Sequence, residues 1–388
     1  MKRFNTTALC IPSKHYMVDL SERVREIKQL VDNGKYFIIN RARQYGKTTT
    51  LRALQQALKD QYVVLSLSFE GIANAGYETE GEFVQSISRL ILDRHEFYGM
   101  DIPDGTIAAL NSFCDRDSST VKMDELYREF RRWIARSDKG MILLLDEVDS
   151  ATNNQVFLDF LGILRDGYIA RESDGVPAFQ SVVLAGVTDV KHLRSKIRSE
   201  DQHRANSPWN IATDFEVDMD FSAADIAGML ADYEVDHDTG MDVPLIAQCV
   251  ADYTHGYPFL VSRVCQIMDE KLVGRGFESL ADVWTPFGVD EAVRRLLSET
   301  NTLFGSLMGK LQNYPELRGK LRAMLMRGEQ IPSVPDDFEQ QQLLMYGFAR
   351  LEHNKLVVAN RIFEMRLYVF FVGESEADPG LRIAAGGR

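Results

Sequence analysis

Residues 40–54 have the sequence NRARQYGKTTTLRAL and nearly match the loop that binds phosphate in many nucleotide-binding proteins. The common pattern of that loop is G-x-x-x-x-G-K-[ST]. Gly46, Lys47 and Thr48 occupy its last three positions, whereas Arg41 replaces the first glycine. A residue other than glycine is tolerated at that first position if its φ is negative. Because backbone N–H groups at a helix N-terminus attract anions, the pattern predicts a site for nucleotide phosphates.

The residues of this loop have distinct expected roles. Gly46 lets the backbone pass close to phosphate oxygens, because it has no side chain to interfere. Lys47 is expected to reach the β- and γ-phosphates, and Thr48 to place its hydroxyl on Mg²⁺. Thr49, the next residue, is expected to join the nucleotide contacts. Arg43 either adds positive charge near the phosphates or points to solvent.

A second motif, MILLLDEVDS at residues 141–150, places two carboxylates after five apolar residues. This pattern predicts a buried strand, and ligands of doubly wound sheets bind at the carboxyl ends of the strands. Asp146 is expected to hold Mg²⁺ through its water shell, opposite Thr48. Glu147 is expected to polarise the attacking water as a general base. Alone, the motif could be a strand that runs into an acidic turn; the upstream loop favours the site. Asp149 is either a supporting acid or the start of the next helix.

A third polar segment follows the mostly apolar residues 181–187. Thr188 is our choice for a contact to the γ-phosphate or to the attacking water, with Asp189 as the alternate. A residue that caps the next helix is an equally valid interpretation of this position.

The elements that must position these residues alternate between strand and helix patterns in the first half of the chain. This alternation favours a parallel sheet covered on both faces. Strands are expected at residues 35–41, 62–71, 140–150, 181–190 and 215–222. Helices are expected at residues 20–34 and 46–60 and near 81–95, 122–137 and 154–165. The sequence thus predicts an α/β fold with a three-layer P-loop core and a five-stranded parallel sheet.

From Ser222 the pattern becomes helical, with expected helices at residues 222–234, 243–256 and 258–274. Residues 315–372 differ: two helices, at 315–328 and 335–347, precede a hairpin that turns at His353–Asn354–Lys355 and a closing helix at 361–371. This order is typical of a winged helix. The expected domains are a nucleotide-binding domain at 1–221, a helical lid at 222–300, a winged-helix-like domain at 301–372 and a flexible tail at 373–388.

The composition is that of a water-soluble globular protein. Of the 388 residues, 45% are hydrophobic and 26% are charged. No apolar run exceeds five residues, and a membrane-spanning helix needs ~20. The N-terminus has no apolar core typical of a secretory signal. The four cysteines form no C-x-x-C pair, so neither a zinc site nor a disulfide framework is indicated. We therefore expect a cytoplasmic protein without a membrane partner.

Charge is distributed unevenly along the chain. The net charge is −13, which weighs against nonspecific binding to nucleic acids. Residues 1–50 nevertheless carry ten Lys and Arg against four acids. This segment is either a solvated basic face or a positive surface around a polyphosphate site.

On these motifs the chain resembles the additional-strand P-loop ATPases. More narrowly, it resembles bacterial proteins described as AAA-like domains, which are relatives of the archaeal-type and signal-transducing (STAND) ATPases. The resemblance spans about residues 8–372. The loop and the acidic strand are specific to the superfamily, while SPWNIATDFEVDMDF, THGYPFLVSRVC and VANRIFEMRLYVFF are features of the narrower family. The resemblance implies ATP and Mg²⁺ as ligands. We find no N-K-x-D guanine motif, so the residues alone leave GTP open.

The resemblance also implies roles for residues outside the two motifs. Arg43 matches the first arginine of the G-P-R-R-x-G-K-T loop of these relatives. Tyr16 and Val18 match a segment that walls the adenine. Gly256 and Pro258 match the G-x-P motif of the lid, whose proline packs on the base; alternatively, Pro258 only begins a helix.

The chain departs from neighbouring families in its arginines. Many AAA+ proteins have an arginine at the start of a lid helix where this chain has GYPF, and Arg263 is a poor substitute. An arginine that acts on a neighbouring subunit would follow the Thr188 strand. Of Arg194, Arg198 and Arg204, we choose Arg198 as the catalytic candidate, although surface helices carry many arginines for solubility.

The candidate recognition helix of the winged-helix-like domain is acidic. Residues 335–347 include Asp336, Asp337 and Glu339, which would repel DNA phosphates. DNA is therefore a possible but disfavoured partner. A protein partner is expected, and a homo-oligomer is possible.

Four functions fit these observations to different degrees. The first is a magnesium-dependent, slow ATPase that acts as a nucleotide-controlled switch or assembly factor. The second is a DNA-associated AAA-type ATPase of the mobile-element or replication type. The third is a nucleotide-binding scaffold without hydrolysis. A small-molecule kinase is the fourth, and the lid and the winged helix argue against it.

Overall fold

The structure is a computed structural model that describes residues 2–187 and 209–377 of the 388-residue chain. It divides into two compact units. The sheet unit comprises Leu20–Arg41 and Lys47–Val217, and the helical unit comprises Met1–Asp19, Ala42–Gly46 and Asp218–Arg388. Each unit is described by itself below.

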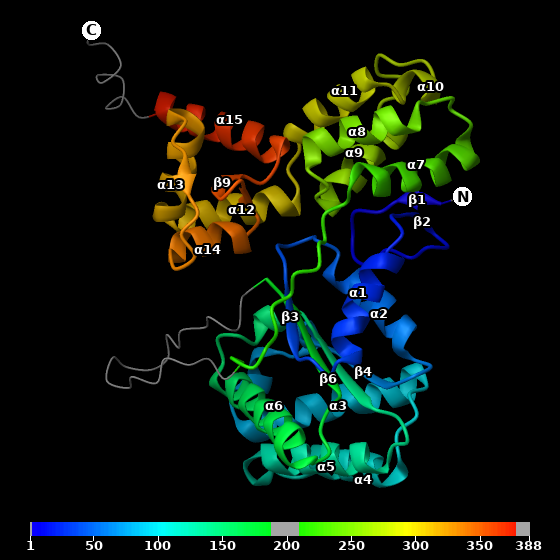
Figure 1. The fold of residues 1–388 in the computed structure, drawn as a ribbon, viewed down its shortest axis with the longest axis vertical. Coiled ribbons are helices and arrows are strands. Elements are labelled where there is room, and N and C mark those ends of the chain that lie inside the picture. The colour runs from blue at the N-terminus through cyan, green and yellow to red at the C-terminus, as the bar shows by residue number, and fades with distance from the viewer. Residues whose placement is uncertain (1, 188–208, 378–388) are drawn as a thin grey trace. The chain divides into compact units, whose positions relative to one another are not determined.

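The sheet unit contains a parallel sheet of the order β3-β6-β5-β4 (Figure 1). The strands are β3 (Phe37–Asn40), β4 (Val63–Ser68), β5 (Met141–Asp146) and β6 (Ser181–Gly186). All six residues of β5 and of β6 are buried. Burial on both faces is expected of parallel strands that helices cover. Because β6 lies between β3 and β5, an additional strand separates the loop strand from the acidic strand.

Helices cover both faces of this sheet, which gives three layers. Alternate residues of each strand point to opposite faces. One set, which includes Leu143, Leu145 and Leu184, packs in a core with α3, α5 and α6. Helix α2 packs on β4, β5 and β6, but its residues do not belong to this core. It also packs on α1. The helices are α1 (Ser21–Asp32), α2 (Lys47–Leu58), α3 (Glu80–Tyr98), α4 (Asp104–Asp115), α5 (Met123–Arg136) and α6 (Gln155–Asp174).

The expected fifth strand at residues 215–222 is wrong. In the described part of the chain the sheet has four strands, and the only bridge near this segment is an isolated one just before it, between Phe37 and Thr213. Beyond that bridge, side-chain contacts take the place of backbone hydrogen bonds between strands. Phe215 stacks on Phe37 at 5.9 Å, and the Arg41 guanidinium donates to the carbonyl oxygen of Val217 at 3.0 Å. The alternating apolar pattern of this segment therefore reflects burial without strand pairing.

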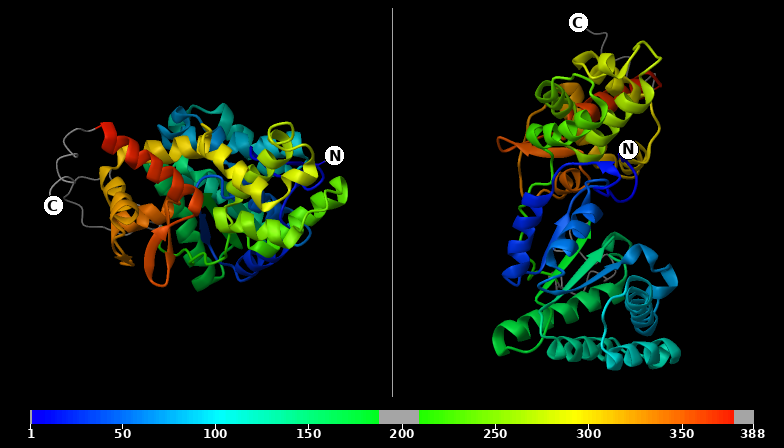
Figure 2. Two further views of the ribbon diagram at one scale, coloured as in Figure 1. Left: turned by 90° about the horizontal axis from the view of Figure 1, so that it is seen from above. Right: turned by 90° about the vertical axis from the view of Figure 1, so that its right-hand side faces the viewer.

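The helical unit begins with the short parallel strands β1 (Arg3–Phe4) and β2 (His15–Tyr16). They pack against α9 and α7 (Figures 1 and 2). The helices of this region are α7 (Ala223–His237), α8 (Val243–Thr254), α9 (Pro258–Lys271), α10 (Leu280–Val283) and α11 (Pro286–Leu297). The expected helices at 222–234, 243–256 and 258–274 correspond to α7, α8 and α9.

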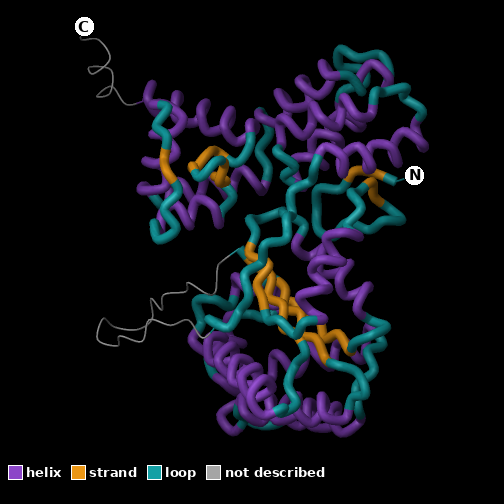
Figure 3. The backbone as a smooth tube through the Cα atoms, in the orientation of Figure 1, coloured by secondary structure: helices purple, strands orange, loops and turns teal. Residues whose placement is uncertain are grey.

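The last part of the helical unit combines four helices with a small antiparallel sheet, and Figure 3 shows that helix dominates it. Its helices are α12 (Thr302–Asn313), α13 (Pro315–Arg327), α14 (Phe338–Met345) and α15 (Arg361–Ala377). Its strands are β7 (Ile331–Pro332), β8 (Ala349–Glu352) and β9 (Lys355–Val358). The hairpin turns at His353 and Asn354, whose φ values of 47° and 62° suit a two-residue hairpin turn, as predicted.

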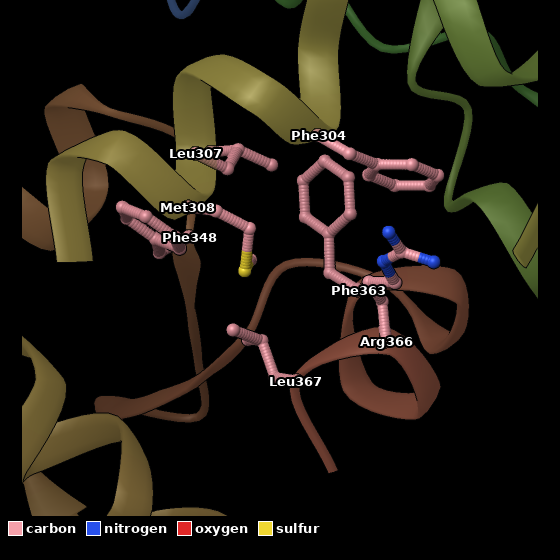
Figure 4. A pocket seen from close by; sticks show the side chains of 7 residues that line it. All are labelled: Phe304, Leu307, Met308, Phe348, Phe363, Arg366 and Leu367. Atoms are coloured by element: carbon pink, nitrogen blue, oxygen red, sulfur yellow. The ribbon is translucent and has the colours of Figure 1, made fainter. Parts of the chain in front are cut away.

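A recess in this last part belongs to its core. It is lined by Phe304, Leu307, Met308, Phe348, Phe363, Arg366 and Leu367 (Figure 4). The Arg366 guanidinium lies 5.0 Å from the Phe304 ring and donates to the carbonyl oxygen of Leu297. The one charged residue of the lining is therefore already engaged within the fold. No helix in the described residues is long and apolar enough to cross a membrane.

Candidate functional site

The predicted phosphate loop connects β3 to α2. The Arg41 backbone N–H donates to the Gly186 carbonyl at 3.2 Å, which extends the pairing of β3 with β6 by one residue. Arg41 is not among the residues with positive φ, so the first-glycine position tolerates a side chain. Positive φ occurs instead at Gln44 (60°) and Gly46 (74°). A left-handed conformation at Gly46 explains the glycine there, directly before α2 begins at Lys47.

The Lys47 side chain folds back across the loop. Its Nζ donates to the carbonyl oxygen of Arg41 at 2.8 Å, and the residue is 7% exposed. Burial raises the pKa values of Asp146 and Glu147, and the positive charge of Lys47 opposes that rise in both. The Lys47 ammonium group thus interacts with both predicted motifs: it donates a hydrogen bond within the loop, and its charge acts on the carboxylates at the end of β5.

Thr48 and Asp146 are hydrogen-bonded to each other, and their expected roles around Mg²⁺ stay predictions. Burial raises the pKa of Asp146, although the Thr48 hydrogen bond and the Glu147 backbone N–H oppose that shift. The N–H of Glu147 donates to Asp146 Oδ1 at 2.9 Å. A hydroxyl and a carboxylate are the oxygen ligands that Mg²⁺ accepts alongside phosphates and water. This donor set fits the metal that the loop implies.

Glu147 has an unusual backbone at the end of β5. Its φ of 55° and ψ of 40° are left-handed, which is rare for a residue other than glycine. Burial, followed by the negative charge of Asp146, raises the pKa of the Glu147 carboxyl. A carboxylate with a raised pKa is suited to accept a proton near neutral pH.

The sequence analysis missed Glu70, a third carboxylate at this end of the sheet. Its charge raises the pKa values of both Asp146 and Glu147. Glu70 follows β4, and the pairing of Ser68 with Asp146 puts the ends of β4 and β5 side by side. The available signal was an acidic residue near the end of the strand expected at residues 62–71.

Within the helical unit, loop residues 42–46 contact several elements that the sequence did not connect to them. The Tyr257 hydroxyl donates to the Arg43 carbonyl at 2.5 Å, and its ring lies 4.4 Å from that of Tyr45. The Tyr45 hydroxyl donates to Asp220 at 2.7 Å. The Gln44 amide donates to Thr302, the first residue of α12, at 3.0 Å. Tyr257, between the predicted Gly256 and Pro258, is thus the residue of that motif that contacts the loop.

The comparisons with known proteins agree with these motifs. The profile of the family described as AAA-like domain matches residues 5–369, nearly the whole chain. The chain belongs to the AAA-like domain family. The predicted kinship to AAA-like P-loop ATPases is therefore confirmed, and membership of this family supports the prediction of ATPase activity.

Solved structures similar to this AAA-like domain have low sequence identity. A Walker-type ATPase of Pyrococcus abyssi matches with a TM-score of 0.62 at 14% identity, over 94% of this chain and 99% of that chain. The ORC2 protein of Aeropyrum pernix matches with a TM-score of 0.47 at 14% identity, over 90% of this chain and 93% of that chain. The first likeness supports the P-loop fold.

A curated relative is much longer than this AAA-like domain. An uncharacterized WD repeat-containing protein of Synechocystis is 22% identical over 267 residues. The match covers 68% of this chain and 21% of the relative, so the chain spans about a fifth of that protein's length.

The residues assigned by resemblance lie in the helical unit. Tyr16 is 1% exposed and donates its hydroxyl to Asp236 at 2.7 Å, and Val18 is 3% exposed in the same core. Pro258 is buried and begins α9. Gly256 has a φ of 71°, and a Cβ there would lie 2.2 Å from the Phe221 carbonyl oxygen, so its glycine has a packing cause. The adenine contacts of Tyr16, Val18 and Pro258 stay predictions.

The candidate arginines are only partly described. The Arg263 guanidinium binds both carboxylate oxygens of Glu299, which Lys271 also contacts at 2.8 Å. Arg263 is thus part of an ion pair that connects α9 to the end of α11. The described residues end at 187 and resume at 209, so Thr188, Asp189, Arg194, Arg198 and Arg204 lie outside them.

Proposed function

We propose that this AAA-like domain is a cytoplasmic, magnesium-dependent ATPase that turns over slowly and acts as a nucleotide-controlled switch or assembly factor. The proposed division is a nucleotide-binding domain at 1–221, a helical lid at 222–300 and a winged-helix-like domain at 301–372; the expected tail at 373–388 is corrected in its first residues, because α15 continues to Ala377. The hydrogen bond between Thr48 and Asp146, together with the Lys47 charge that acts on both Asp146 and Glu147, carries the proposal.

Each residue of this site has a chemical task. Lys47 and the N–H groups that begin α2 bind phosphate oxygens. Thr48 and Asp146 hold Mg²⁺, which supplies charge neutralisation on the phosphates when bound. Glu147 takes the proton of the attacking water, a role that its raised pKa favours.

Further residues complete the proposed site. Arg43, whose side chain is exposed, and Thr49 contact the nucleotide phosphates. Tyr16, Val18 and Pro258 surround the adenine. We assign the γ-phosphate or water contact to Thr188. Arg198 is assigned to catalysis, on a neighbouring copy if the chain assembles with itself.

Contacts of loop residues 42–46 with other residues of the helical unit support the role of a switch. Residues 42–46 form the turn that must wrap a phosphate, and Tyr257, Asp220 and Thr302 hydrogen-bond to three of them. A nucleotide that alters the loop alters these contacts as well. Because coupling between two sites is reciprocal, a partner of the lid or of α12 would in turn alter nucleotide affinity.

A protein partner is favoured over DNA by the chemistry of α14. Asp337 and Glu339 pair with Lys320 at 2.5 and 3.0 Å, and Gln340 and Gln342 are buried. These side chains support the fold of the domain and are poorly placed to read bases. The DNA-associated ATPase is the alternative.

Calorimetry and a phosphate-release assay test the proposal. We expect Mg²⁺-dependent binding of ATP, with GTP as a competitor that tests base preference. Lys47→Ala should weaken ATP binding by about 10–100-fold, because a charged hydrogen-bond donor to phosphate is lost. Glu147→Gln should retain binding and slow hydrolysis by about 10²–10⁴-fold.

Lys59→Ala is the matched control, since Lys59 is an exposed lysine directly after α2. Equal ATP binding by Lys47→Ala and Lys59→Ala, or no Mg²⁺-dependent binding by the unchanged chain, would refute the proposal. Binding without an effect of Glu147→Gln would favour the scaffold that does not hydrolyse ATP.

A further inference from the structure

The turn after β5 holds Glu147 in a conformation that its side chain does not favour. Left-handed backbone at a residue other than glycine persists only where surrounding contacts fix it. The turn continues through the short helix Val148–Ser150. The contacts of this short helix therefore decide where the Glu147 carboxylate points.

Asp149 connects this turn to the end of β6. Its Oδ2 accepts the backbone N–H of Val187 at 2.7 Å. The two segments also approach closely, because a Cβ on Gly186 would lie 2.9 Å from Val148 Cγ2 and 3.1 Å from Asp149 Oδ1. Neither β6 nor the turn can shift alone without disturbing this contact.

Ser150 connects the same turn to the end of β4. Its hydroxyl contacts two carbonyl oxygens, that of Glu147 at 3.0 Å and that of Phe69 at 3.3 Å. Thr152 adds a hydrogen bond from its hydroxyl to the Asp149 carbonyl at 3.0 Å. The turn that carries Glu147 is thus attached to the strands on both sides of β5.

We propose that Asp149 is a positioning residue for ATP hydrolysis, because its bond to the Val187 N–H fixes the orientation of Glu147 relative to β6. This inference rests on the proposed function and deepens it. It gives Asp149 no contact with the nucleotide. In sequence, Val187 directly precedes Thr188, so the same bond fixes the point from which that segment starts.

Two substitutions at Asp149 separate its hydrogen bond from its charge. Asp149→Asn keeps an oxygen that can accept the Val187 N–H, whereas Asp149→Ala removes the acceptor. We expect Asp149→Ala to lower kcat by about 10–100-fold, as misplacement of a reacting group does, with the Kd for Mg-ATP little changed. Asp149→Asn should retain most of kcat.

Stopped-assay kinetics on the full chain measures kcat, and calorimetry measures the Kd for Mg-ATP. Asp159→Ala is the control. Asp159 is an exposed carboxylate that accepts a hydrogen bond from Gln155 on α6, away from the turn. Wild-type kcat in Asp149→Ala would overturn the inference, and so would an equal loss in Asp149→Asn, which would show that the charge matters.

Ser150→Ala keeps the inference testable if Asp149→Ala does not fold. It removes the two hydroxyl contacts and should also lower kcat without weakening ATP binding; an unchanged kcat would overturn the inference. If the unchanged chain neither binds nor hydrolyses Mg-ATP, the proposed function itself fails, which is a different result.

Discussion

Glu147 is surrounded by more negative than positive charge. Burial and Asp146 raise its pKa, and Asp149 and Glu70 add to the effect, while Lys47 opposes it. The raised pKa makes the carboxylate a stronger base than an exposed glutamate. The same surroundings that disfavour its charge therefore suit it to activate water.

The pH dependence of hydrolysis follows from this shift. Glu147 can accept a proton only when it is ionised, so kcat should rise with pH through a midpoint above the ordinary glutamate value of about 4.3. A raised pKa means that the protonated, inactive form persists to higher pH than in an exposed glutamate. Phosphate release measured at saturating Mg-ATP, from about pH 4.5 to about pH 8, gives this midpoint.

Glu147→Gln is the control for this titration, because an amide does not ionise in this range. Its residual rate should lack the rise. A wild-type midpoint at or below the ordinary glutamate value would contradict the general-base role.

Among individual residues, the sequence indicated as neighbours those that lie at the end of one strand or at the start of one helix. Lys47, Thr48, Asp146 and Glu147 come together because parallel strands carry their carboxyl ends to one edge of the sheet. Tyr257 could not be predicted as a loop contact, because it lies 214 residues from Arg43 in sequence. The three-dimensional path of the chain decides such a contact.

Among the elements, the phosphate loop depends on the start of α9. Tyr257, which precedes that helix, is 2% exposed, and its ring also lies 5.4 Å from that of Phe363 in α15. Its hydroxyl therefore reaches the Arg43 carbonyl from a fully packed position. A buried hydrogen bond of this kind stabilises the folded state, and its removal leaves a carbonyl without that donor.

Tyr257→Phe tests this connection. The change keeps the ring and removes the hydroxyl, so the free energy of unfolding should fall by about 1 kcal/mol. Urea denaturation followed by tryptophan fluorescence measures the loss. Tyr253→Phe is the matched control: the Tyr253 hydroxyl donates to Asp290 at 2.8 Å in a partly exposed place, so its loss should cost less. Equal losses in the two variants would argue against a special role of the Tyr257 contact.

The elements predicted best were those with an unmistakable apolar pattern. The strands that became β5 and β6 are mostly apolar, and burial of all their residues required them to be so. The segment at 215–222 failed because alternating burial does not specify backbone pairing, and Phe215 packs by ring stacking instead. Helix α12 was missed because it follows a stretch with no clear period.

For the whole molecule, the excess of acids limits the partners it can bind. The net charge of −13 acts against nonspecific binding to nucleic acids, and Asp337 and Glu339 at the start of α14 are engaged within the domain. The Lys320 hydrogen bond holds the pKa of Asp337 below its usual value, so this carboxylate stays ionised over the physiological range. Family membership alone leaves DNA open, since the family profile describes a domain and names no partner.

We therefore expect double-stranded DNA to leave the ATPase rate of the full chain unchanged. Phosphate-contact binding depends on released counterions and is strongest at low salt, so the assay should be run at low and at physiological ionic strength. A rate increase that vanishes with added salt would support the DNA-associated alternative. Glu339→Lys is a useful comparison, because it replaces an acid of α14 with a base and should increase any weak attraction to DNA. If even this variant ignores DNA at low salt, α14 is not a nucleic-acid surface, and a protein partner becomes the candidate for controlling the switch.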